Sequence, residues 1–217
     1  MNAKKMSVEI SAVIKEYTDL TKLNHRYASF DFCYNYFSSH KGNLVGENLQ
    51  TSCMQLWSYL ASWGMVVRGN ELQSTNYSCL KGVVDYVNKH TEFYDLSIDD
   101  DHYADKILKL YNEIKKSLGF TQKNQKTLIT KIILGVYACY PAIDINVSTT
   151  FGMRITGDLR ETDIEKIVDF YKENRTYLAP ILKDIKCLSF AGKKTDVPYT
   201  FAKLIDMYGF MAGLKKD

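Results

Sequence analysis

The sequence predicts an all-α fold, a compact bundle of about eight or nine helices. Apolar residues recur with helical spacing along the whole chain of 217 residues, and no stretch shows the sustained alternation of a half-buried strand. Hydrophobic residues make up 46% of the chain and only 3 prolines occur, as in an ordinary globular domain. We expect one domain over residues 1–217, with two helical lobes divided near residue 120 as the alternative.

Three helices in the first half are predicted from apolar residues three or four positions apart. Between the helix that contains Ile10–Leu20 and the helix that contains Leu49–Leu60, Ser29 is placed to cap a short helix that runs through Phe37 and ends near Gly42. Gly64 is placed to end the helix that contains Leu49–Leu60. The three apolar faces consist of Ile10, Val13, Ile14, Tyr17 and Leu20; of Leu49, Cys53, Leu56, Trp57 and Leu60; and of Tyr77, Leu80, Val83, Val84 and Val87.

The strongest helical pattern runs from Tyr103 to Leu118, with Gly119 directly after it. Acidic residues at 99–101 precede this helix and lysines occupy its last turn, which complements the helix dipole. The next helix extends from Gln125 to Cys139 and is closed by Pro141.

Two more helices complete the prediction. Thr162 and Glu165 have the spacing of a capping box, and Asp196 is placed to cap a C-terminal helix that continues through Leu214. We expect a loop at 191–197 and short extended pieces at 65–68 and 153–156.

Charge and cysteine content restrict the class of protein. The net charge is +3, below what a dedicated nucleic-acid domain usually carries, so this charge neither demands nor excludes such a partner. The 5 cysteines form no C-x-x-C pair and lie among apolar residues, which favours a reducing compartment. The start of the chain has no apolar signal region, and the most apolar stretch is broken by Lys131, Pro141 and Asp144. We therefore expect a cytoplasmic protein with no membrane partner.

Familiar catalytic signatures are missing, so whether the chain is an enzyme stays open. It contains no phosphate-binding G-x-x-x-x-G-K-[ST], no G-x-G-x-x-G, no H-E-x-x-H and no G-x-S-x-G. The 4 histidines and 5 cysteines show no metal-ligand spacing. We expect neither a metal nor a cofactor.

Aromatic residues are unusually dense, with 16 tyrosines and 2 tryptophans in the chain. Tyr34 belongs to a group of aromatic residues at 27–37, and Trp63 to a second group at 57–63. Such groups can form a stacking platform for nucleobases. The alternative is that they pack between helices, which their spacing already explains in part.

Three charged residues are candidates for ligand binding. Arg26 and Asp31 precede or begin a helix, where a carboxylate can also serve as a cap. Arg68 follows an apolar helix and is placed to bind phosphate or carboxylate through its planar fork, or to hold a loop to helix carbonyls.

The segment Tyr137–Asp144 supplies the remaining candidates. Asp144 follows a helix and Pro141, and it is either a catalytic acid or base, a ligand anchor, or the N-cap of a helix from Ile145. Tyr140 lies beside it as a candidate ligand contact. Lys131 interrupts the apolar run, and a partly buried lysine usually pairs with an acid, here Asp144 or Asp31, unless its amine reaches water.

Segments 26–37, 59–68 and 130–144 resemble an all-helical bacterial protein family without a settled activity. This resemblance covers about two thirds of the chain and implies a fold more than a function. The helix-Pro-x-x-Asp layout is also distantly similar to helix-hairpin-helix DNA glycosylases. The chain departs from that family because it lacks the Leu-Pro-Gly-Val-Gly hairpin and a clear catalytic lysine.

The prediction for function is a non-catalytic helical module that binds nucleic acid or a nucleotide. One alternative is an enzyme acting on a nucleobase or nucleotide, with Asp144 as acid or base. Another is a protein–protein adaptor that buries exposed aromatic residues, for example in a homodimer. The test common to these hypotheses is whether Arg26, Asp31, Arg68, Lys131 and Asp144 converge on one pocket.

Overall fold

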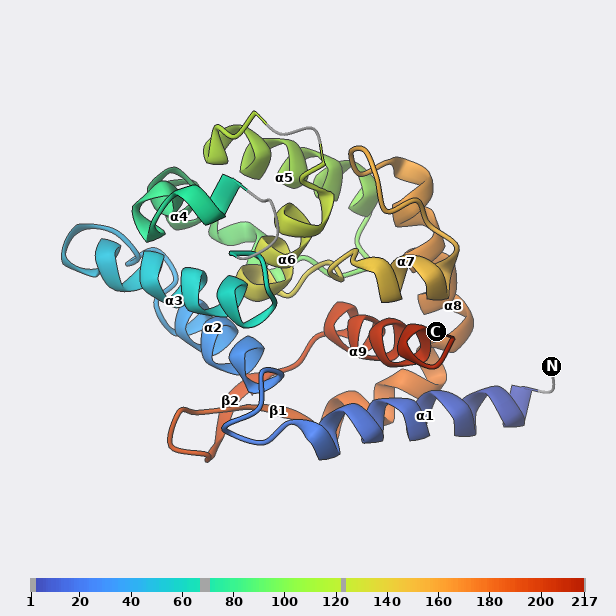
Figure 1. The fold of residues 1–217 in the computed structure, drawn as a ribbon. Coiled ribbons are helices and arrows are strands. Elements are labelled where there is room, and N and C mark those ends of the chain that lie inside the picture. The colour runs from blue at the N-terminus through green and yellow to red at the C-terminus, as the bar shows by residue number, and fades with distance from the viewer. Residues whose placement is uncertain (1–2, 67–70, 122–123, 217) are drawn as a thin grey trace.

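The computed structural model describes residues 3–66, 71–121 and 124–216, and it confirms the all-α bundle (Figure 1). Helices make up 67% of it. Its helices within the described ranges are α1 (Ala3–Leu20), α2 (Ala28–Ser39), α3 (Leu49–Ser62), α4 (Lys81–Lys89), α5 (Tyr103–Leu118), α6 (Lys126–Tyr137), α7 (Ile145–Phe151), α8 (Glu161–Asp184) and α9 (Phe201–Leu214). Short 3₁₀ turns lie at Gly46–Asn48, Glu71–Ser74, Tyr77–Leu80 and Thr91–Asp95.

Helix α6 lies at the centre of the bundle, where α2, α3 and α5 pack against it (Figure 1). All of its residues except Thr127 are buried, as expected for a helix that is apolar on every side. Gly135 allows α3 to approach closely, because a Cβ at this position would lie 2.4 Å from the ring of Tyr59. Side chains of α6 can therefore reach the middle of the molecule from a fixed backbone.

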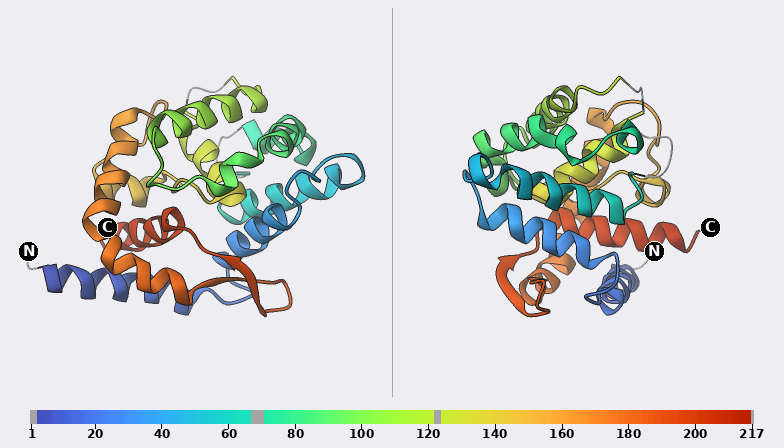
Figure 2. Two further views of the ribbon diagram at one scale, coloured as in Figure 1. Left: turned by 180° about the vertical axis from the view of Figure 1, so that it is seen from behind. Right: turned by 60° about the vertical axis from the view of Figure 1, so that its left-hand side comes forward.

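Helix α9 forms a second centre and contacts α1, α7 and α8 (Figure 2). Gly213 lets α7 approach, because a Cβ there would lie 2.2 Å from the carbonyl oxygen of Asn146. Although the helix is apolar, it buries Lys203 and Asp206, which pair at 2.9 Å. These two charges stabilise the loop that leads into α7, as described below.

A small antiparallel hairpin, β1 (Lys186–Leu188) and β2 (Lys194–Pro198), packs on α2 (Figure 1). The prediction of a loop at 191–197 and of Asp196 as a helix cap was wrong. Asp196 is exposed in β2, and Thr200 caps α9 instead by accepting a hydrogen bond from the Lys203 N–H at 3.1 Å. The strands were missed because they are too short for an alternating pattern to stand out.

Three further boundaries differ from the prediction. Helix α2 begins at Ala28, so Ser29 lies in the first turn and donates to the Arg26 carbonyl rather than capping the helix. Arg160 is the N-cap of α8, where the carboxylate of Asp163 accepts its N–H, so Thr162 and Glu165 form no capping box. Residues 153–156 form no strand, and 65–66 lie in a turn.

Other local predictions are confirmed. Asp144 caps α7, and Gly119 ends α5 in the left-handed conformation. All 5 cysteines are free thiols. No helix of the described residues has both the length and the apolar character needed to cross a membrane.

Candidate functional site

Four of the predicted site residues meet in the structure. The Trp63 ring lies 4.5 Å from the Lys131 ammonium and 5.1 Å from the Arg26 guanidinium, both measured to the ring centroid. Lys131 also lies 3.3 Å from the Asp144 carboxylate. These contacts join the loop before α2, the end of α3, the middle of α6 and the start of α7. We call Arg26, Tyr27, Trp63, Lys131 and Phe210 the aromatic–cation cluster.

The rings of the cluster form an ordered stack. Trp63 is parallel to Tyr27, with centroids 5.6 Å apart, and Tyr27 is parallel to Tyr17 at 4.3 Å. Phe210 meets Tyr27 and Trp63 edge-on at 5.8 and 5.4 Å. Parallel offset and edge-on contacts are the favoured geometries of aromatic pairs. The stack therefore gives the cations that contact it a well-defined wall.

Lys131 and Asp144 form the largely buried ionic part of this site. Their side chains are 5% and 15% exposed, respectively. One oxygen of the Asp144 carboxylate accepts from Lys131 and the other accepts from the Val147 N–H at 3.1 Å. The predicted partner of Lys131 is confirmed, and so is the capping role of Asp144. A catalytic role for Asp144 stays a prediction.

Buried polar groups hold the turn that carries Asp144. The Ala142 N–H donates to the Asp206 carboxylate at 3.1 Å, and the Ile143 N–H donates to the Thr130 hydroxyl at 2.9 Å. Asp206 is itself paired with Lys203. Because these bonds fix the two residues before Asp144, its carboxylate is held over α6.

Arg26 differs from Lys131 in having no acidic partner among the residues that the structure describes. Its side chain is exposed, and no carboxylate of the described residues forms an ion pair with its guanidinium. The three rings of Tyr27, Trp63 and Phe210 hold this guanidinium at 5.1–5.9 Å. Cation–π contacts of this kind orient an arginine without neutralising it.

Arg26 lines a hollow of about 390 Å³ between α2, α3 and the hairpin, which we call the Arg26 hollow. None of the described residues that line it is an aspartate or a glutamate. The His25 ring nitrogen Nδ1 accepts from the Tyr27 N–H, which leaves Nε2 to carry the proton when the ring is neutral. The polar side chains that line the Arg26 hollow are Asn24, His25, Arg26, Ser29, Gln55, Ser58 and Ser62. The apolar ones are Leu23, Phe32, Cys33, Tyr59 and Phe190.

The turn of the hairpin forms one wall of the Arg26 hollow. Phe190 is 86% exposed and touches Phe32 of α2 through an edge contact of 5.4 Å between ring centroids. The Gly192 backbone passes so close to Leu23 that a Cβ would lie 2.8 Å from its Cδ1. The exposed ring of Phe190 is therefore attached to a turn that is packed on two sides.

The remaining predicted residues lie elsewhere. Asp31 faces the hairpin, where it accepts from the Leu188 N–H at 3.0 Å and from the Tyr199 hydroxyl. Tyr34 is a core residue stacked on Phe30, with centroids 5.5 Å apart. Tyr140 is also buried, and its hydroxyl has no partner within the described residues. Arg68 lies outside the described residues.

Asp31 holds both ends of the hairpin to α2 through one buried carboxylate. Burial raises its pKa to about 6, although bonds from Tyr199 and Leu188 and the nearby Lys203 charge act in the opposite direction. The carboxylate therefore titrates within the range of mildly acidic solutions.

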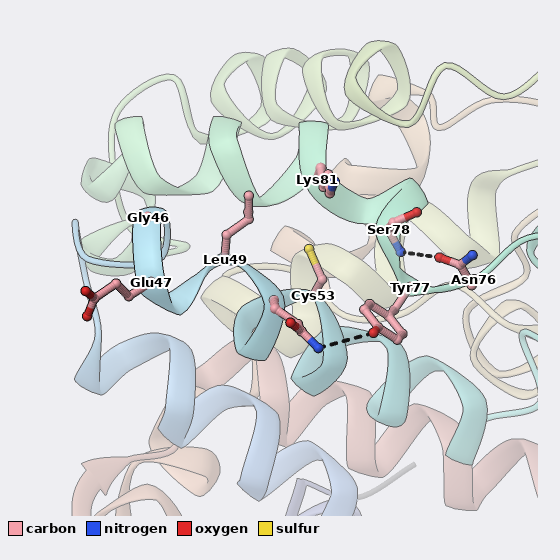
Figure 3. Close-up of a pocket in the computed structure, with 9 residues that line it drawn as sticks. Gly46, Glu47, Leu49, Cys53, Asn76, Tyr77, Ser78 and Lys81 are labelled. Carbon is pink, nitrogen blue, oxygen red and sulfur yellow. Dashed lines mark hydrogen bonds between the residues drawn. The ribbon is translucent and has the colours of Figure 1, made fainter.

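A larger hollow of about 660 Å³ lies between the start of α3 and the start of α4 (Figure 3). Gln50 donates to the Tyr77 hydroxyl at 3.3 Å across one side. The hollow carries both Glu47 and Lys81, so its charge favours no one class of ligand. Burial raises the pKa of its Cys53 thiol to about 11, with partial compensation by Lys81, so the thiol is protonated at neutral pH and is a poor nucleophile.

Several important residues were not identified from the sequence. Phe190 was overlooked because a lone aromatic residue in a loop has no periodic signal, and Gln55 because a polar residue on a helix is ordinary. Lys203 and Asp206 had a usable signal, since two charges three positions apart interrupt an otherwise apolar helix. Among the described residues, no group of three or more His, Cys, Asp or Glu side chains is arranged to hold a metal ion.

In comparisons with known proteins, the chain matches no family model, no curated protein and no solved structure.

Proposed function

We propose that the protein is a non-catalytic helical module that binds nucleic acid or a nucleotide and holds a phosphate at Arg26. The observation that carries this proposal is an exposed guanidinium that, within the described part of the chain, has no carboxylate partner and lines a hollow with no acidic residue among its described lining. A ligand that supplies negative charge would complete this arrangement.

Phosphate suits this arginine for geometric reasons. The planar guanidinium can donate two parallel hydrogen bonds to a phosphate, and bonds of this charge-assisted kind are among the stronger ones in proteins. The contacts of Arg26 with Trp63 and Tyr27 reduce the freedom of the side chain before any ligand arrives. Binding then costs less conformational entropy than it would for a mobile surface arginine.

Nearby lysines add a longer-range attraction. Lys22 lies in the loop that carries Arg26, and Lys193 and Lys194 lie on the hairpin whose turn packs against this loop. All three are exposed and form no ion pair with a described residue. Such a group attracts a polyanion, and the attraction weakens as salt is added.

The proposal is tested by titrating fluorescently labelled oligonucleotides, single-stranded and duplex, with the protein at 50 and 200 mM salt. We expect binding that weakens steeply with salt, and about a tenfold or greater loss for Arg26→Ala. Arg26→Lys should fall between the two, because it keeps the charge and loses the fork.

Lys172→Ala is the matched control. Lys172 is an exposed cation of α8, and the hollow that it lines is rich in carboxylates. This variant should bind like the unchanged protein. Failure of the unchanged protein to bind a single strand, a duplex or a mononucleotide at low salt would contradict the proposal. So would Arg26→Ala binding as well as Lys172→Ala, with both variants folded by circular dichroism.

A further inference from the structure

The Arg26 hollow has a second feature that its charge does not explain, which is the position of Phe190. A single exposed apolar residue is common on protein surfaces and needs no special reason. Phe190, however, is 86% exposed and lines the same hollow as Arg26. Its ring contacts only the edge of Phe32 among the ring contacts described, with centroids 5.4 Å apart and planes at 62°.

The hairpin holds this ring in place from two sides. Beside its turn, the Leu188 N–H at the end of β1 donates to Asp31, and at its open end the hydroxyl of Tyr199, which follows β2, donates to the same carboxylate. At its tip, the backbone at Gly192 lies against Leu23, and the Ser189 N–H donates to the Lys193 carbonyl at 2.8 Å. The aromatic ring is thus exposed and yet attached to an ordered backbone.

We propose that Phe190 is a stacking platform for one unpaired base, and that the ligand of the Arg26 hollow is therefore single-stranded nucleic acid. This inference rests on the proposed function. An aromatic ring stacks on any base whose face is free, whereas the faces of bases inside a duplex are already covered by their neighbours. The hollow measures about 390 Å³, at the lower end of the range for small-ligand sites, so it accommodates one nucleotide.

Phe190 and Arg26 would bind different parts of the nucleotide, the base and the backbone. Phe190 would contact the base, Arg26 the adjoining phosphate, and the Gln55 amide lies in the same lining as a hydrogen-bonding group for the base edge. Lys193 lies three residues after Phe190 and is placed to attract the next stretch of backbone. Stacking on a ring is tolerant of sequence, so we expect little preference among the bases.

The test uses the full chain and three ligands of equal length. They are an ordinary single strand, a strand in which every base is removed, and an abasic strand with one central base retained. We expect the fully abasic strand to bind about 5- to 100-fold more weakly than the ordinary one. One retained base should restore most of the affinity. A duplex should bind more weakly than the single strand.

Substitution of the ring gives an independent measure. Phe190→Ala should weaken the ordinary strand as much as base removal does, and should leave the affinity for the abasic strand unchanged. Phe190→Trp should retain binding. Leu214→Ala is the control, because Leu214 is another exposed apolar residue, 43% accessible, at the end of α9.

The outcomes separate this inference from the proposed function. If no nucleic acid binds, the proposed function fails. Suppose that the strands bind and that Arg26→Ala lowers their affinity. If Phe190→Ala and base removal then leave the affinity unchanged, or if the duplex binds as tightly as the single strand, the proposed function stands and the stacking platform is refuted.

Discussion

Replacing Asp144 by Asn separates two roles of this side chain. Asn caps a helix about as well as Asp, so the bond to the Val147 N–H is kept. The change removes the negative charge that lies 3.3 Å from the Lys131 ammonium. Because the Lys131 side chain is only 5% exposed, water cannot fully replace that partner.

The expected loss of stability follows from these contacts. Removing one member of a buried ion pair costs about 3–5 kcal/mol. The Trp63 ring lies 4.5 Å from the ammonium before and after the change, so this cation–π contact of roughly 1 kcal/mol cancels in the comparison. We therefore expect Asp144→Asn to lower the free energy of unfolding by about 3–5 kcal/mol. Asp144→Ala should lose roughly 1 kcal/mol more, because it also removes the cap.

Urea unfolding followed by tryptophan fluorescence measures these losses, because Trp63 reports on the site directly. Lys131→Met should cost less than Asp144→Asn, since Asp144 is more exposed than Lys131. The double variant should lose less than the sum of the two single variants. Additive losses, or an Asp144→Asn variant as stable as the unchanged protein, would refute the ion pair as described.

Two further predictions concern Asp31 and the glycines of α9. Burial raises the pKa of Asp31 to about 6 in the folded chain. The protonated carboxyl therefore stabilises the fold by roughly 3 kcal/mol below about pH 4, and this contribution disappears as the pH rises through 6. The difference in unfolding free energy between the unchanged protein and Asp31→Asn should follow that decline, and a difference that does not vary from pH 4 to 7 would contradict it. Gly213→Ala should lower the melting temperature more than Gly209→Ala, because the new methyl group would meet the Asn146 backbone at 2.2 Å in the first case and the Phe151 ring at 2.6 Å in the second. Equal melting temperatures in a thermal unfolding experiment would show that the α7 backbone can move aside.

The helices were predictable where a local pattern and the packing agree. The face from Tyr103 to Leu118 and the stop at Gly119 correspond to α5 in the structure. The ends of the helices had weaker sequence signals, and the predicted ends were wrong where two residues were both suited to cap the same helix. Thr162 has the right chemistry for a cap, but Asp163 is also held by Lys126 at 3.1 Å, and this buried contact fixes the start of α8 two residues earlier.

The candidate site was predictable only in part, because it joins segments far apart in the sequence. Lys131 stood out as a charge in an apolar run, and a nearby acid was a sound choice of partner. Nothing local placed Trp63 beside both Arg26 and Lys131, since this depends on how α3 and α6 cross. Asp31 was grouped with the site because of its neighbours in sequence, whereas its carboxylate points to a hairpin more than 150 residues later.

Helix α9 has a consequence for how the chain matures. It packs against α1, and Asp206 on it holds the Ala142 N–H in the turn that carries Asp144. The ribosome synthesises α1 before α9, so the apolar residues that α9 buries in the folded protein emerge well before α9 does. A message truncated after residue 200 would therefore yield an aggregating chain and not a shorter working protein. Quality-control proteases would be expected to remove such a product, as they remove other chains that expose apolar surface.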